Sequence, residues 1–282
     1  MMKQEFYLPS LDGAHRLHCI RWVPEGQPRA VLQLVHGMAE HIGRYDEFGR
    51  FLASKGIEVV GHSHLGHGLT AKNEDELGWF GEPDGNFLLI EDIHRVREQS
   101  RIPGVPYFIL GHSMGSFIAR LAAEKYVKPD KLIIMGTGGP NPIAGVGLAL
   151  IGIIKACKGP RHISPFIDKM AFGGYNKRFD DGASDPRAWL TKDTAVRERY
   201  ANDPFCSYKF TVSAMGDLIR LIKYANRSAW FKNIPTDLPI LLVAGRDDPV
   251  GDYGRGVETV GNRLQKIHVR SRDHSHIRTK DL

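Results

Sequence analysis

The stretch that decides the fold is Tyr107-Phe108-Ile109-Leu110-Gly111-His112-Ser113-Met114-Gly115-Ser116-Phe117, where an apolar run meets a Gly-x-Ser-x-Gly turn and then a helical pattern. Residues 106–110 are typical of a strand buried on both faces, and residues 116–126 carry apolar side chains at helical spacing. A strand, a glycine-flanked serine and a helix in that order predict a nucleophile elbow, a strained turn that exposes the serine hydroxyl. We therefore predict Ser113 as nucleophile and the Met114 backbone N–H as an oxyanion donor. The alternative is a chance match in a chain with 31 glycines, which the flanking strand and helix disfavour.

The composition indicates a large globular core. With 282 residues and 42% hydrophobic side chains, the chain fits one α/β domain carrying an insertion better than two domains. The net charge of +6, with arginines spread along the whole chain, is a mild basic excess that suits weak attraction to an anionic surface. Because no basic run is interleaved with aromatic residues, we expect no nucleic-acid partner.

The cysteines and the N-terminal sequence indicate a reducing compartment. Cys19, Cys157 and Cys206 are widely spaced and odd in number, which argues against a disulfide framework. The first residues are polar and lack the apolar core of a signal peptide, so we expect a cytoplasmic protein. The longest apolar stretch, 143–154, is shorter than the roughly 20 residues that a membrane-spanning helix needs.

The first strands predict a sheet edge followed by a turn that matters for catalysis. Residues 5–8 and 17–22 flank a turn signal and predict an antiparallel hairpin. Residues 30–35 form an apolar strand that runs into His36-Gly37-Met38. A His-Gly pair directly after a core strand lets the backbone turn sharply and present the Met38 N–H as a second oxyanion donor. A tight turn without such a role is the alternative.

The next segments alternate between helix and strand. Helices are expected at 44–55 and 87–97, and strands at 57–61 and 131–135. This alternation predicts a mostly parallel sheet covered by helices on both faces, with the ligand site at the carboxyl ends of its strands.

Three histidines lie close together in the stretch 61–68. His62, His64 and His67 have a spacing that could suit a metal ion, but no acidic or cysteine ligand stands beside them. We therefore expect a structured loop there, with no metal and no cofactor in the protein.

The regular alternation stops after residue 140. The segment 141–230 is rich in aromatic residues, glycines and prolines, and it predicts a helical cap inserted into a core formed by 1–140 and 231–282. We expect this cap to be a lid with an apolar inner face for an acyl chain, and peripheral membrane contact could occur through the cap. The alternative is a packed helical subdomain without lipid contact.

A carboxylate follows the returning strand at 239–244. Asp248 is the preferred candidate and Asp247 the second, because an acid at this strand end, later than the serine, fits the order Ser…Asp…His. Two solvated loop aspartates would be the alternative.

The catalytic base is expected near the C-terminal end of the sequence. Residues 258–264 predict a helix, 266–269 a last strand, and 271–276 a loop containing His274 and His276. A histidine there could accept the Ser113 proton and return it to the leaving alcohol. His274 fits the loop length better than His276, and either could be an ordinary surface histidine.

Five motifs identify a family resemblance. HGMAEHIGRY (36–45), GHSHLGHGLTA (61–71), FILGHSMGSFIAR (108–120), FGGYNKRF (172–179) and LPILLVAGRDDPVG (238–251) resemble the monoacylglycerol lipase and lysophospholipase branch of the α/β-hydrolases. The likeness covers nearly the whole chain up to about residue 269.

The resemblance implies an α/β-hydrolase fold and a carboxylic-ester hydrolase that acts through a Ser-His-Asp triad and an acyl-enzyme. It implies Ser113 as nucleophile, Asp248 as acid, Met38 and Met114 as oxyanion donors, no cofactor, and a small acyl ester of glycerol or a lysophospholipid as substrate. Two features depart from the family pattern. Ser63 stands where the family usually has an aspartate, and RDHSHIRTKDL (272–282) stands where an R-H-E motif and a further helix are usual.

Two other functions remain open at this point. A serine aminopeptidase or small-ester hydrolase could use the same scaffold, with Asp180 or Asp181 as anchors for a substrate amine. A catalytically impaired lipid-binding relative would be the consequence of a C-terminal sequence that lacks a working base.

Overall fold

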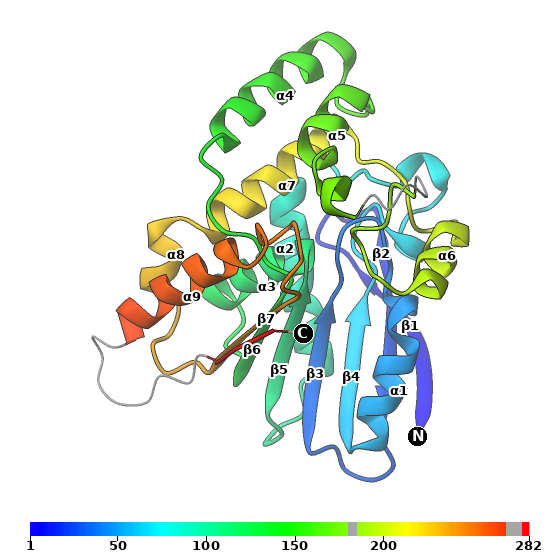
Figure 1. Cartoon of the computed structure of the whole chain (residues 1–282). Helices are drawn as coiled ribbons and strands as arrows, with labels where there is room; N and C mark the ends of the chain where they lie inside the picture. Colours follow the sequence, from blue (N-terminus) through cyan, green and yellow to red (C-terminus); the bar gives the residue numbers. More distant parts are fainter. Residues whose placement is uncertain (180–184, 269–277, 282) are drawn as a thin grey trace.

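The computed structural model describes residues 1–179, 185–268 and 278–281, and an eight-stranded sheet organises it (Figure 1). The spatial order of the strands is β1-β2-β4-β3-β5-β6-β7-β8. Only β1 with β2 and β2 with β4 pair antiparallel, and every other neighbouring pair is parallel. The strands are β1 Met2–Pro9, β2 Arg16–Val23, β3 Ala30–Val35, β4 Ile57–His62, β5 Tyr107–His112, β6 Lys131–Met135, β7 Ile240–Ala244 and β8 Arg278–Asp281. The predicted α/β-hydrolase architecture, a mostly parallel sheet with helices around it, is confirmed.

Alternate side chains of the central strands enter two separate cores, because successive residues of a strand point to opposite faces. Val31, Val35 and Ile109 join the larger core, which also contains side chains of α2 (Gly85–Ser100) and α3 (Met114–Lys125). The intervening side chains face Trp22 and Ala53, the latter on α1 (Asp46–Ser54). Burial on both faces explains why β3 is apolar at nearly every position.

The predicted hairpin forms the sheet edge, as expected. Phe6 pairs with Cys19, and the turn between the strands closes through a hydrogen bond from Gly13 N–H to Ser10 O of 3.3 Å.

The strand expected at 266–269 is wrong. Residues up to His268 continue α9 (Arg255–His268), because Val257, Val260 and Leu264 keep a helical spacing and bury one face of the helix. Val269 lies outside the described residues. The strand beside β7 is instead β8, with Leu241 opposite Arg278.

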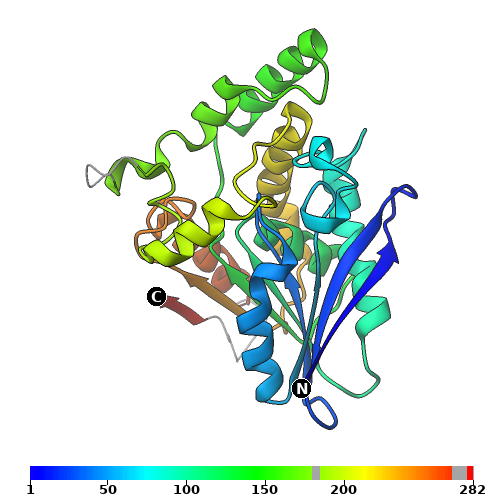
Figure 2. The same cartoon turned by 90° about the vertical axis from the view of Figure 1, so that its right-hand side faces the viewer.

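Further helices come between β6 and β7 in the chain, at the carboxyl ends of the parallel strands (Figures 1 and 2). They are α4 Ala144–Lys158, α5 Pro165–Phe172, α6 Thr194–Asn202, α7 Val212–Ala225 and α8 Ser228–Asn233; short 3-10 turns lie at Ile42–Tyr45, Gly68–Thr70, Glu74–Glu76 and Tyr175–Arg178. Both views show α4 as the outermost element. Residues of α7 and α8 join the larger core, and so do Ile151 of α4 and Ile167 of α5. The domain division at 141–230 remains our prediction.

Candidate active site

Ser113 lies between β5 and α3 in a backbone conformation that few residues adopt. Its φ is 52° and its ψ is −120°, and a non-glycine residue with positive φ is strained by about 1–3 kcal/mol. The Ser113 N–H donates to Met135 O at 2.9 Å, which ties the turn to the neighbouring strand β6. The strain is consistent with the elbow that the sequence predicts.

The glycines on either side of Ser113 are required by close backbone packing. A Cβ atom on Gly115 would lie 2.1 Å from Val35 O, and one on Gly111 would lie 2.4 Å from Gly115 O. Both distances are far below van der Waals contact, and both neighbouring atoms belong to the backbone. Strand β3, strand β5 and helix α3 can therefore approach one another only when these two positions are glycine.

A cavity of about 720 Å³ opens above Ser113, and Met38, Met114 and Asp248 also line it. Gly136, which follows β6, lies close to both Asp248 and Ser113. A Cβ on Gly136 would lie 3.5 Å from Asp248 Oδ2 and 3.8 Å from Ser113 N. The structure thus brings together four of the five predicted site residues at the carboxyl ends of neighbouring strands.

The fifth, His274, and its alternative His276 lie outside the described residues, as do Asp180 and Asp181.

The two candidate acids have different surroundings. Asp248 is partly buried, and its Oδ1 accepts a hydrogen bond from Val250 N–H at 2.9 Å. Burial raises the pKa of Asp248, although the Val250 N–H and the nearby His112 oppose that shift. Asp247 is exposed and forms an ion pair of 3.0 Å with Lys192. Both carboxylates line the cavity, and Asp248 is the one whose orientation a backbone N–H fixes.

Both predicted oxyanion donors have an available N–H. Met114 is the first residue of α3, so its N–H has no acceptor within the helix. On either side of Met38, Gly37 N–H donates to Glu40 Oε1 at 2.6 Å and Ala39 N–H donates to His67 Nε2 at 3.4 Å. Between them, the Met38 N–H donates to no other atom of the described chain.

The histidines that could have suggested a metal support this loop instead. His36 accepts from His64 N–H at 3.0 Å through Nε2, and His64 Nε2–H donates to His36 O at 3.2 Å. Both rings, and those of His62 and His67, are fully buried. Burial lowers their pKa values, to about 4 for His64 and about 3 for His67. The lowered pKa values keep the four rings neutral, and the hydrogen bonds of His36, His64 and His67 support the loop.

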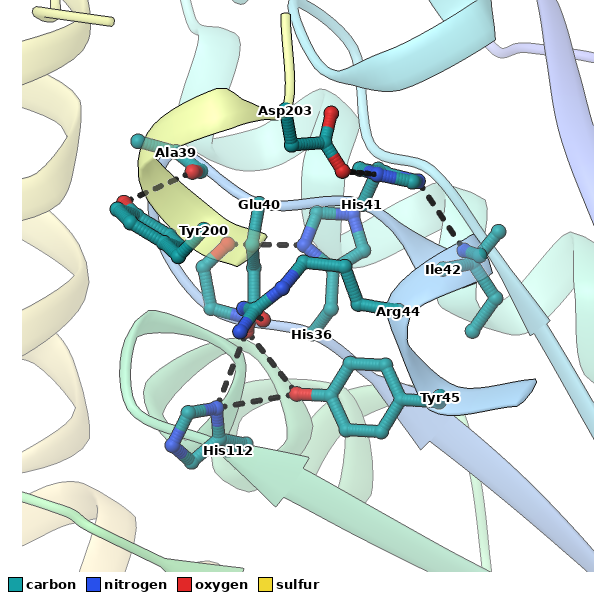
Figure 3. A network of polar contacts seen from close by, with 12 residues as sticks. His36, Ala39, Glu40, His41, Ile42, Arg44, Tyr45, His112, Tyr200 and Asp203 are labelled. Atoms are coloured by element: carbon teal, nitrogen blue, oxygen red, sulfur yellow. Dashed lines mark hydrogen bonds and ion pairs between the residues drawn. The ribbon is translucent and has the colours of Figure 1, made fainter. Parts of the chain in front are cut away.

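Sequence reasoning missed Glu40, whose carboxylate joins the loop to the elbow (Figure 3). Its Oε1 accepts from Gly37 N–H, from Tyr45 Oη–H at 3.0 Å and from His112 Nδ1–H at 3.1 Å, while Oε2 pairs with Arg44 at 2.5 Å. Burial alone would raise the pKa of Glu40, but His112 and Arg44 outweigh it and lower that pKa to about 2. The only sequence signal was a glutamate inside a glycine turn after an apolar strand.

His41, next in the loop, contacts the helical insertion. Its Nε2–H donates to Asp203 Oδ2 at 2.8 Å, and its Nδ1 accepts from Gly43 N–H at 3.2 Å. One ligand atom from each of His41, Asp203 and Cys206 lies within 4.8 Å of the others. The imidazole and the carboxylate of that trio are already hydrogen-bonded to each other.

The walls of the cavity that come from the insertion are largely apolar. They include Phe172, Tyr175, Phe179, Trp189 and Leu218. This lining suits a hydrocarbon group more than a charged one. In the described part of the chain, no helix combines the length and apolar character needed to cross a bilayer.

A strained serine between a parallel strand and a helix, with free N–H groups beside it, defines the chain as an α/β-hydrolase. The family model described as "Serine aminopeptidase, S33" matches residues 26–272. The chain belongs to this family, and within the superfamily it lies in the monoacylglycerol lipase branch. It is thus a hydrolase of the serine ester hydrolase type.

Individual relatives agree with that placement. The monoglyceride lipase homolog of Monkeypox virus is 40% identical over 280 residues, which cover 97% of this chain and 91% of that protein. The monoacylglycerol lipase of Mycolicibacterium smegmatis is 28% identical, covering 89% of this chain and 80% of that protein. The crystal structure of a thermostable carboxyl esterase from Bacillus coagulans in complex with glycerol has a TM-score of 0.89 and 29% identity, covering 100% of this chain and 90% of that chain.

Proposed function

We propose that this chain hydrolyses carboxylic esters of the monoacylglycerol or lysophospholipid type through an acyl-enzyme on Ser113. The observation that carries the proposal is the cavity, where a strained serine, two unpaired backbone N–H groups and an oriented carboxylate meet apolar walls. Relatives named monoglyceride lipase and an esterase whose structure contains glycerol support the same substrate class.

In the proposed reaction, Ser113 Oγ attacks the ester carbonyl while a histidine takes its proton. The Met38 and Met114 N–H groups stabilise the oxyanion, and each contributes on the order of a hundredfold or more in rate. The histidine then protonates the leaving alcohol, and a water molecule releases the acid by the reverse sequence. We propose His274 as this base, with His276 as the alternative, and Asp248 as the residue that holds its tautomer.

Substitutions at the triad positions test the proposal. Ser113→Ala should abolish both monoolein hydrolysis and labelling by a fluorophosphonate. Asp248→Asn should lower kcat on the order of a thousandfold or more, while the matched control Asp247→Asn should stay close to wild type, because exposed ion pairs contribute little. His274→Ala and His276→Ala, measured in parallel, identify the base.

Three results would favour a different function. Unchanged hydrolysis by Ser113→Ala would contradict the proposed nucleophile. Faster turnover of aminoacyl amides than of acyl glycerols would favour an aminopeptidase. Labelling of Ser113 without turnover of any ester would favour a lipid-binding relative.

We also propose that the cap contacts membranes peripherally. Large apolar side chains are exposed on and beside α4 and α5, including Val146, Ile153 and Phe166, which are 72%, 63% and 61% exposed. Because α4 is the outermost element (Figure 2), these side chains could reach a lipid surface before the sheet does. Replacing all three by serine should weaken sedimentation with phosphatidylcholine and phosphatidylglycerol vesicles, and unchanged sedimentation would contradict the contact.

A further inference from the structure

The loop that carries Met38 is held from both sides at the next residue, Ala39. Ala39 has a φ of 51°, a conformation that alanine adopts only when its surroundings impose it. Its N–H donates to the buried core residue His67, and its carbonyl oxygen accepts a hydrogen bond of 3.0 Å from Tyr200 Oη–H. Tyr200 belongs to α6 in the helical insertion, so a residue of the insertion helps to fix the backbone beside the oxyanion donor (Figure 3).

A second contact joins the same two segments. His41 and Asp203 form the hydrogen bond of 2.8 Å described above, and Asp203 follows directly after α6. Both residues are only partly exposed, with 18% and 25% of their side-chain surface accessible. These two hydrogen bonds hold the loop at positions 39 and 41, on either side of Glu40.

Arg44 connects the contacts between α6 and the loop to the elbow at Ser113. Its guanidinium lies over the Tyr200 ring at 4.9 Å and also pairs with Glu40, which contacts His112 next to the serine. Burial raises the pKa of Tyr200 to about 12, so the hydroxyl keeps its proton and remains a donor at neutral pH. A continuous set of contacts therefore runs from α6 through the loop to the residue before Ser113.

We propose that Tyr200 is a positioning residue for ester hydrolysis, and that with Asp203 it fixes the Met38 N–H where the oxyanion forms. The helical insertion then has two roles. It covers the acyl chain, and it completes the oxyanion site. This inference rests on the proposed function, and it differs from a simple lid because it concerns substrates too short to need a lid.

Tyr200→Phe is the most direct test, because it removes one hydroxyl and keeps the ring over Arg44. With the short substrate p-nitrophenyl butyrate, kcat should fall about tenfold with little change in KM, because a slightly displaced donor loses part of its effect on the transition state. Asp203→Asn, which weakens the second contact, should act in the same direction with a smaller effect, and it keeps the test available if Tyr200→Phe does not fold.

Lys155→Met is the matched control. Lys155 on α4 pairs with Glu82, so it joins the insertion to the core at a place away from the loop. This variant should keep the wild-type kcat for the short ester.

A wild-type kcat for p-nitrophenyl butyrate in Tyr200→Phe, with a raised KM for monoolein alone, would overturn the inference and leave the insertion as a cover only. An equal loss of kcat in Lys155→Met would also overturn it, since any attachment of the insertion would then serve. Neither result bears on the nucleophile, whose test is Ser113→Ala.

Discussion

The two walls of the catalytic cavity are built in different ways. The elbow at Ser113 can be recognised from adjacent residues, a strand, a serine between two glycines and a helix, although its glycines also pack against the backbone of β3. The loop at 36–41 is held by side chains from elsewhere, and its partners His67 and Tyr200 lie 28 and 161 positions from Ala39 in the sequence. The comparison teaches that a local motif is enough to predict the proposed nucleophile, whereas the position of the proposed oxyanion donor in the loop depends on contacts with distant parts of the chain.

Gly115→Ala should disrupt the elbow and have the largest effect on stability and activity. Its Cβ would lie 2.1 Å from Val35 O and 2.4 Å from His36 O, and these backbone atoms cannot rotate away. We expect the free energy of unfolding, measured in urea, to fall by about 3 kcal/mol and ester hydrolysis to be lost. Gly145→Ala is the control, because a Cβ there meets no atom within 4 Å. Equal stability of the two variants would show that the packing around the elbow is looser than described.

Glu40→Gln should loosen the loop at 36–41 and have an intermediate effect on kcat. The amide oxygen can still accept from Gly37 N–H, but Arg44 and His112 lose their counter-charge. We expect kcat for p-nitrophenyl butyrate to fall about tenfold, and further in Glu40→Ala, where an unsatisfied Gly37 N–H would cost about 1–3 kcal/mol. Glu25→Gln, at an exposed glutamate paired with the N-terminus, serves as control. Wild-type kcat in both Glu40 variants would show that this carboxylate does not position the loop.

The central strands could be predicted from the sequence because a buried strand requires a run of adjacent apolar residues. The apolar run at 30–35 and the Gly-x-Ser-x-Gly turn at 111–115 needed no distant partner to be recognised. A strand was wrongly predicted at 266–269 because four apolar or amphipathic residues in a row suit a strand, whereas residues 266–268 belong to the end of α9.

The supports of the loop could not be predicted. Nothing near Ala39 indicates that His67 would accept from its N–H, or that Tyr200 would donate to its carbonyl oxygen. In the sequence, Glu40 was visible only as a glutamate in the turn after an apolar strand. Its importance comes from burial and from four donors that converge on it, and both are properties of the tertiary structure.

Mild acid should affect the stability of the loop at 36–41 without changing any residue. Because the pKa of folded His67 is lowered to about 3, the unfolded chain binds more protons there from about pH 6.5 downwards. His67 therefore stabilises the fold less as the pH falls, by up to about 1.4 kcal/mol per pH unit. Other buried groups titrate in the same pH range, such as Asp92, whose pKa is raised to about 6.

The contribution of His67 is isolated by comparison with His67→Gln, whose amide does not titrate. The difference in unfolding free energy between wild type and this variant should shrink, and then reverse, between pH 7 and pH 4. A difference that does not change with pH would mean that His67 is not held neutral in the folded protein.

The most direct measurement for the whole account is a crystal structure of the enzyme inactivated by a short alkyl phosphonate. We predict a covalent bond to Ser113 Oγ and a phosphonyl oxygen about 2.7–3.1 Å from both the Met38 and the Met114 backbone nitrogens. A phosphonate attached to another residue, or an oxygen that meets only one of these two N–H groups while the loop lies apart from Tyr200, would contradict it.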